Sequence, residues 1–85
     1  MPELCRFFGI VIRMYASDHP PPHFHAEYAE HEAQISIGDR RIMRGSLPAR
    51  QSRLVMEWAA KREADLLAAW AKASADEAPG TIEPL

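Results

Sequence analysis

Apolar and polar side chains alternate in steps of two along the first half of the chain. In the segment 8–15, Phe8, Ile10, Ile12 and Met14 fall on one side, and Gly9, Val11, Arg13 and Tyr15 fall on the other. The alternation returns in "HFHAEY" (23–28) and "EAQISI" (32–37), and a shorter apolar segment, "RIMRGSL" (41–47), follows a turn at "GDR". A period of two is typical of strands with one buried face. The pattern therefore predicts an antiparallel meander, with Ile42 in its core.

The period changes after "GSLP", where apolar residues begin to recur at helical spacing. These residues are Leu54, Val55, Trp58, Ala59, Leu66 and Trp70. They predict a helical part that begins near Pro48, a residue suited to a first helical turn, and runs to about Ala75. Arg62 falls near the middle of the apolar stripe. Either its stem reaches past apolar neighbours to water, or two helices meet near "KREAD".

The two halves together predict an α+β fold. We expect a three- to four-stranded antiparallel meander sheet, covered on one face by a long C-terminal helix or helix pair. The 85 residues fit a single domain, 1–85, with the sheet in 1–47, the helical part in 48–78 and an extended tail in 79–85. Because a core of this size is small, a partner interface or self-association would add to its stability.

The stretch "DHPPPHFH" (18–25) joins the first two strands and holds three of the four histidines. Prolines do not continue a strand ladder, so they predict a stiff loop. If strand pairing keeps the apolar residues on one face, the opposite face receives Tyr15 near His23 and Arg13 near His25. The face that the helices leave open is then the one that carries chemistry.

Three interpretations of this histidine cluster remain open. His23, His25, Arg13 and Tyr15 are the candidate catalytic residues of a metal-independent nuclease, with histidine as general acid or base and arginine as the phosphate-binding group. Alternatively, His23 and His25 chelate a divalent metal such as zinc, with Asp18, His19 or Glu27 as a third ligand. In the third interpretation the imidazoles only shape the loop. Asp18 and His19 are expected to brace that loop.

Charge and composition narrow these alternatives. Ten basic and twelve acidic side chains give a net charge of −2, without the basic excess typical of nucleic-acid-binding proteins. Arg40, Arg41 and Arg44 form a small basic cluster beside a turn, which fits either a solvated edge or contact with a nucleic-acid backbone. The lone cysteine, Cys5, excludes an intrachain disulfide and is expected to be a small buried apolar group. With no signal-peptide pattern and no long apolar run, a cytoplasmic protein without a membrane partner is expected.

Several strings resemble a family of short bacterial proteins known as domain of unknown function family 4160. They are "RFFGIVIRMY", "DHPPPHFHAEY", "EAQISI", "LVMEWAAKREADLLAAW" and the closing "IEPL". The segment from Ile12 to Tyr28 is the most specific part, although the position of Pro20 varies in the family. The positions that match the motif are Arg13, Tyr15, Asp18, His19, His23, His25 and Tyr28.

The resemblance implies a stand-alone bacterial protein whose gene often sits beside a second small gene, as in toxin–antitoxin pairs. We therefore expect one component of such a pair, with the product of the adjacent gene as partner and RNA as the target if the protein is an enzyme. The alternatives are a non-catalytic module that binds and regulates its partner, and a small metal-binding protein. The sequence does not decide whether the protein is an enzyme.

Overall fold

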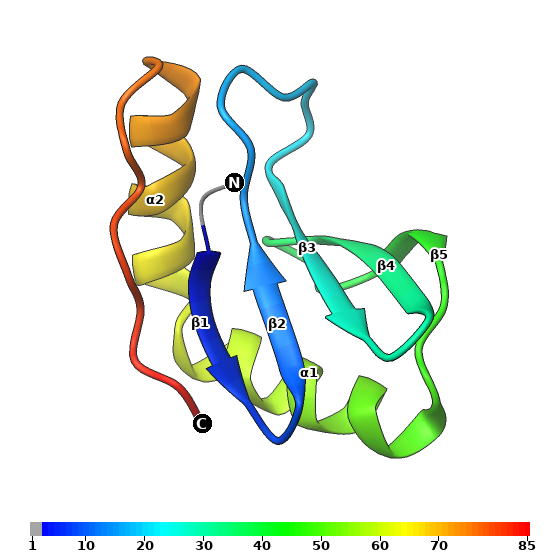
Figure 1. Cartoon of the computed structure of the whole chain (residues 1–85). Coiled ribbons are helices and arrows are strands. Elements are labelled where there is room, and N and C mark those ends of the chain that lie inside the picture. Colours follow the sequence, from blue (N-terminus) through cyan, green and yellow to red (C-terminus); the bar gives the residue numbers. More distant parts are fainter. Residues whose placement is uncertain (1–2) are drawn as a thin grey trace.

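The computed structural model describes residues 3–85, and within them five strands precede two helices. The strands are β1 (Glu3–Phe7), β2 (Ile10–Arg13), β3 (His23–Tyr28), β4 (His31–Ser36) and β5 (Ile42–Gly45), and the helices are α1 (Ala49–Lys61) and α2 (Glu63–Ser74). The strands form one antiparallel sheet in the order β1-β2-β3-β4-β5 (Figure 1). The predicted α+β fold, an antiparallel meander followed by a helix pair, is confirmed.

The sheet contains one strand more than the alternation indicates, because Phe8 and Gly9 form a turn between β1 and β2. Phe8 and Gly9 both have positive φ, 50° and 78°, which is the backbone of the tight turns that join two strands. Phe7 is therefore the buried residue, 6% exposed, whereas Phe8 is 61% exposed. The expected placement of Phe8 on the apolar face is wrong, while Ile10, Ile12 and Met14 are buried as predicted.

Helix α1 covers the apolar face of the sheet through Trp58. The Trp58 ring lies 5.5 Å from the Phe7 ring and 5.7 Å from the Phe24 ring, measured between centroids. Arg62 lies between the two helices with φ −114°, so of the two alternatives the structure shows two helices that meet near "KREAD". No helix within residues 3–85 is long and apolar enough to cross a membrane.

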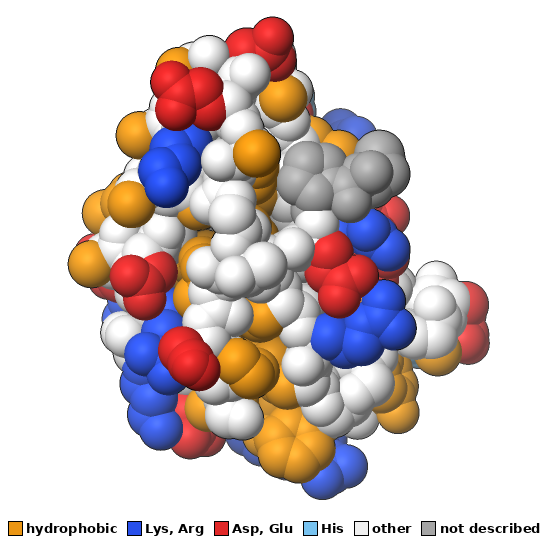
Figure 2. All heavy atoms as spheres, turned by 60° about the vertical axis from the view of Figure 1, so that its left-hand side comes forward, with side chains coloured by type: hydrophobic (Ala, Val, Ile, Leu, Met, Phe, Trp, Pro, Cys, Tyr) orange, Lys and Arg blue, Asp and Glu red, His pale blue; other side chains and the backbone are white. Residues whose placement is uncertain are grey.

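The two edges of the sheet differ in what covers them. At the β1 edge, the backbone N–H of Ile82 donates to the carbonyl oxygen of Leu4 at 2.9 Å, and Trp58 Nε1 donates to the carbonyl oxygen of Glu83 at 2.8 Å. Figure 2 shows this side of the molecule, where acidic and basic side chains are interspersed. The residues of β5, at the opposite edge, are all exposed.

Ile42 is not the core residue that the sequence pattern predicts. Its side chain is 39% exposed, because it lies on the edge strand β5. The pairing of β4 with β5 also shifts register between Gln34 and Ile35, so the alternation that holds in β3 is interrupted here.

Gly45 offers a direct test of the β4–β5 pairing. Its φ is +79°, and a Cβ atom at this position would overlap the carbonyl oxygen of Glu32. We expect Gly45→Ala to destabilise the protein by about 2 kcal/mol or more, which lowers the Tm by roughly 10 °C in a domain of this size. Thermal unfolding followed by circular dichroism measures the effect.

Gly38→Ala is the matched control. Its φ is not positive, and an added Cβ would meet nothing within 4 Å. This variant should unfold within about 2 °C of the parent protein. Equal Tm values for the two alanine variants would contradict the described pairing.

The Cys5 thiol should react slowly in the folded protein. Cys5 is only partly buried rather than fully buried as expected, but this burial raises the pKa of its thiol to about 11, and the nearby Glu3 charge acts in the same direction. A raised pKa lowers the fraction of reactive thiolate, so at pH 8 the reaction with Ellman's reagent should be roughly a hundredfold slower than for an ordinary cysteine. The rate should climb steeply from pH 8 to pH 10 in the folded protein. Equal rates for folded and urea-unfolded protein at pH 8 would count against this expectation.

Candidate functional site

The pairing of β2 with β3 places the histidines on the side of the sheet opposite to the core. Ile12 pairs with Ala26, and Arg13 pairs with His25, in the register that the sequence predicts. Phe24 and Ala26 are buried in the core. Because side chains alternate along a strand, His23 and His25 point to the other face.

This second face of the sheet is not open to solvent at His23 and His25, so the expectation of an open surface is wrong there. The His23 side chain is 0% exposed and the His25 side chain is 9% exposed. The Trp70 ring, from α2, lies 5.3 Å from the His23 ring, and the exposed His19 ring stacks on His23 at 5.2 Å. The edge of Tyr15 packs against His25 at 4.5 Å. The loop before β3 and helix α2 therefore enclose the pair.

Asp18 lies at the centre of the cluster. Its Oδ2 atom is 3.0 Å from His23 Nε2 and 3.1 Å from His25 Nε2. Its Oδ1 atom accepts a hydrogen bond from the backbone N–H of His19 at 2.8 Å. The preceding residue, Ser17, is hydrogen-bonded to α2: its backbone N–H donates to the carbonyl oxygen of Ala73 at 3.1 Å. Asp18 thus connects the loop, the strand and both histidines.

The second nitrogen of each ring also faces an oxygen. His23 Nδ1 lies 2.8 Å from the carbonyl oxygen of Pro21, and His25 Nδ1 lies 3.2 Å from Glu32 Oε2. A carbonyl oxygen or a carboxylate only accepts hydrogen bonds. Both Nδ1 atoms must therefore carry hydrogen, whether or not Nε2 is also protonated.

Hydrogen on both Nδ1 atoms leaves an electrostatic conflict at Asp18 if the rings are neutral. A neutral imidazole with hydrogen on Nδ1 has a lone pair on Nε2, and both Nε2 atoms face the same carboxylate oxygen. Burial by itself raises the pKa of the Asp18 carboxyl. When the rings are protonated, a hydrogen bond from His25 and the His23 and His19 charges act together with the His19 backbone N–H, outweigh burial and leave that pKa below its ordinary value. With Asp18 ionised, the arrangement requires positive charge, either as added protons on the rings or as a cation among the three side chains.

Arg13 and Tyr15 lie beside the histidines without joining the Asp18 cluster. The Arg13 guanidinium binds Glu27, with 3.2 Å between Nε and Oε1. Partial burial raises the pKa of the Tyr15 phenol, and the negative charges of Glu27 and Glu32 raise it further. Tyr15 is therefore a neutral hydrogen-bonding group at neutral pH, next to His25.

Three contacts of the site are absent from the sequence-based candidates. They come from Glu32, from the Pro21 carbonyl and from Trp70. His25 pairs with Gln34 in the β3–β4 register. Glu32 is two residues before Gln34 on the same strand, so its side chain lies on the same face as His25. The position of Glu32 therefore follows once the hairpin register is known. The Pro21 carbonyl and Trp70 carry no signal in the residue pattern, because loop conformation and helix placement determine both contacts.

The three central residues have the composition and spacing of a metal site. One donor atom each from Asp18, His23 and His25 lies within 4.8 Å of the others. Ligands bonded to one zinc ion at tetrahedral angles are about 3.4 Å apart, so small movements would place all three on a common ion. The outer nitrogens are held by an oxygen in both rings, as is usual for metal-bound histidines.

Comparisons with known proteins identify a family. The family model described as "Domain of unknown function (DUF4160)" matches residues 9–71. No curated protein and no solved structure matches the chain. The matched region covers most of the chain and includes Asp18, His23, His25 and Glu32. The chain therefore belongs to the DUF4160 family.

Proposed function

We propose that this DUF4160 protein binds one divalent transition metal through Asp18, His23 and His25. The observation that carries the proposal is that an acceptor oxygen faces each of the four nitrogens of the two imidazole rings. Oxygens at both Nδ1 atoms direct both Nε2 lone pairs at one carboxylate oxygen, which is unfavourable without a cation. A metal ion resolves this conflict, because imidazole lone pairs and carboxylate oxygens are both its ligands.

The alternative source of positive charge is less favourable at this place. If both rings were protonated, the buried His23 would carry a charge with no exposure to water. Moving charged side chains out of water costs several kcal/mol for each ion unless the geometry compensates fully. One metal ion satisfies both nitrogens and Asp18 together, while Pro21 and Glu32 keep their hydrogen bonds to Nδ1.

The ligand types favour a borderline metal such as zinc over magnesium or calcium. Magnesium and calcium prefer oxygen ligands, whereas two imidazoles and one carboxylate suit zinc, nickel or iron. Three protein ligands leave a coordination position for water or a substrate oxygen, as in hydrolytic zinc sites. That position would lie near Asp18, the most exposed of the three, at 18% of its side chain.

Metal binding should show clear stoichiometry. Protein made without a histidine tag and dialysed against chelator should take up one Zn²⁺ or Ni²⁺ per chain, measured by calorimetry and elemental analysis. Zn²⁺ at a hundredfold excess over its Kd adds about 2.7 kcal/mol of stability, so the Tm should increase by roughly 10 °C or more. Asp18→Asn and His25→Ala should each lower the affinity at least tenfold.

His31→Ala is the matched control, because His31 is a partly exposed histidine outside the cluster. It should bind metal like the parent protein. Circular dichroism must show that the Asp18 and His25 variants are folded. Uptake far below one equivalent by the parent protein, or equal affinity for the parent and Asp18→Asn proteins, would refute the metal site.

A second candidate function is metal-independent cleavage of RNA by the histidine pair. It is favoured by His25, whose two nitrogens contact Asp18 and Glu32, because a protonated imidazole between carboxylates can act as a general acid. The surrounding charges oppose it. RNA binding depends on basic groups, whereas Arg13 is engaged by Glu27 and the net charge is −2.

Cleavage assays in chelator separate the two functions. If the histidines act alone, the protein should cut single-stranded RNA in EDTA, and His25→Ala should lower the rate by at least a hundredfold. RNA that remains intact in EDTA eliminates the metal-independent reaction but does not test the metal site.

The pairing with an adjacent gene product, as toxin, antitoxin or non-catalytic module, stays a prediction, as does self-association.

A further inference from the structure

The β5 edge of the sheet is bare, in contrast to the β1 edge. All four residues of β5 are exposed, and β4 is its only neighbour in the sheet among residues 3–85. At the other edge, the C-terminal segment is hydrogen-bonded to β1 through Ile82 and Leu4. An edge strand presents unpaired backbone N–H and C=O groups to any extended chain that approaches it.

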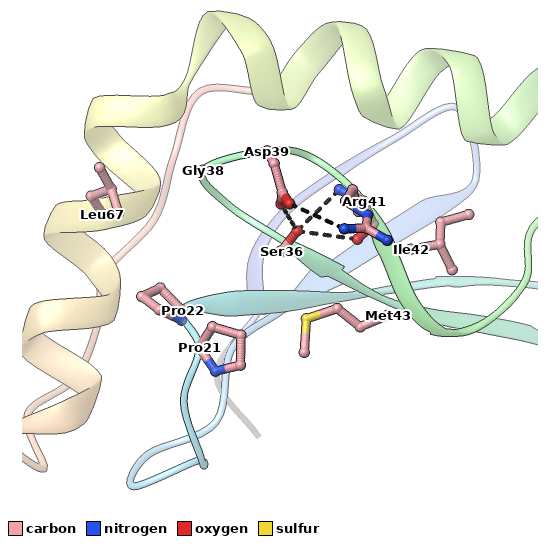
Figure 3. Close-up of a pocket in the computed structure, with 9 residues that line it drawn as sticks. All are labelled: Pro21, Pro22, Ser36, Gly38, Asp39, Arg41, Ile42, Met43 and Leu67. Carbon is pink, nitrogen blue, oxygen red and sulfur yellow. Dashed lines mark hydrogen bonds and ion pairs between the residues drawn. The ribbon is translucent and has the colours of Figure 1, made fainter.

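An apolar groove lies directly beside this bare edge. It has a volume of about 560 Å³, and its apolar walls are Pro21, Pro22, Ile42, Met43 and Leu67. Figure 3 shows these side chains around the hollow, contributed by the proline loop, β5 and α2. Leu67 is 43% exposed, and Ile42 and Met43 are each 39% exposed. Large apolar side chains grouped in this way on a small protein indicate a binding surface.

The charges along the edge select its partner. Arg41 and Arg44 flank the apolar residues of β5, and both are exposed. Arg41 is 4.0 Å from Asp39 on its own turn, and Arg44 has no ion pair within residues 3–85. An antiparallel pair of two β5 strands would bring arginines of both copies together, which is destabilising. A strand with carboxylates would instead place opposite charges side by side.

We propose that β5 and the adjacent groove bind an extended acidic segment of a partner protein. The segment adds a sixth strand to the sheet through backbone hydrogen bonds, as in other complexes formed by strand addition. Its acidic side chains lie against Arg41 and Arg44, and an apolar side chain enters the groove beside Met43 and Leu67. This surface is separate from the proposed metal ligands, so each proposal can fail without the other.

Short synthetic peptides test the proposal. A fluorescent peptide of alternating glutamate and valine should bind the full chain, and its counterpart of alternating lysine and valine should bind at least tenfold more weakly, measured by anisotropy. N-methylation of alternate backbone amides in the acidic peptide should abolish binding if strand pairing holds it. NMR amide shifts should change at residues 42–45, and hydrogen exchange there should slow.

Charge reversal gives the matched variants. Arg41→Glu combined with Arg44→Glu should reverse the preference, so that the lysine peptide binds better than the glutamate peptide. Arg50→Glu combined with Arg53→Glu makes the same charge change on exposed positions of α1 and should leave the preference unchanged. Leu67→Ser should weaken the acidic peptide at least threefold through the groove.

Three results would overturn the proposal. One is equal affinity for the acidic and basic peptides at low salt. Another is unchanged binding of the N-methylated peptide, since attachment would then not involve the backbone of β5. The third is a dimer at micromolar concentration whose contact protects the amides of β5, because a second copy of the chain would then be the occupant.

Discussion

The Trp58 side chain joins the three parts of the fold, and the site depends on the arrangement that it fixes. Its ring packs between Phe7 of β1 and Phe24 of β3, and its nitrogen donates to the carbonyl oxygen of Glu83 in the C-terminal tail. Burial of an aromatic ring of this size is one of the largest single contributions available to a small core. By holding Phe24 inward, Trp58 also determines which face of β3 receives His23 and His25.

The histidine cluster buries several polar groups in a protein whose hydrophobic core is small. Asp18, His23 and His25 together contain two imidazoles and a carboxylate with little exposure to water. A cluster built only for stability would be better served by apolar side chains of the same size. Within residues 3–85, every buried side-chain nitrogen or oxygen has a partner. The polar groups are thus held in place by their neighbours, so that only small movements would bring the three side chains onto one cation.

Alternation along the strands carries most of what the sequence reveals about the site. The period of two in β2 and β3 correctly pairs Arg13 with His25 and separates both from the core. It fails at Phe8, where positive φ values form a turn inside an apolar run, and at Ile42, where a register shift and the edge position expose the side chain. The sequence names Asp18 as a candidate ligand and loop brace, but its contact with both Nε2 atoms depends on how the proline loop folds back rather than on any repeat.

The unequal edges of the sheet set an upper limit on assembly. The tail lies against β1 through the Ile82–Leu4 hydrogen bond, and within residues 3–85 β5 is the edge that has no such segment beside it. A strand from another chain could pair with the sheet at β5 without displacing any segment of this chain. Within residues 3–85, two copies that paired through β5 would therefore form a closed dimer, because further growth by strand pairing would need the β1 edge, where the tail lies.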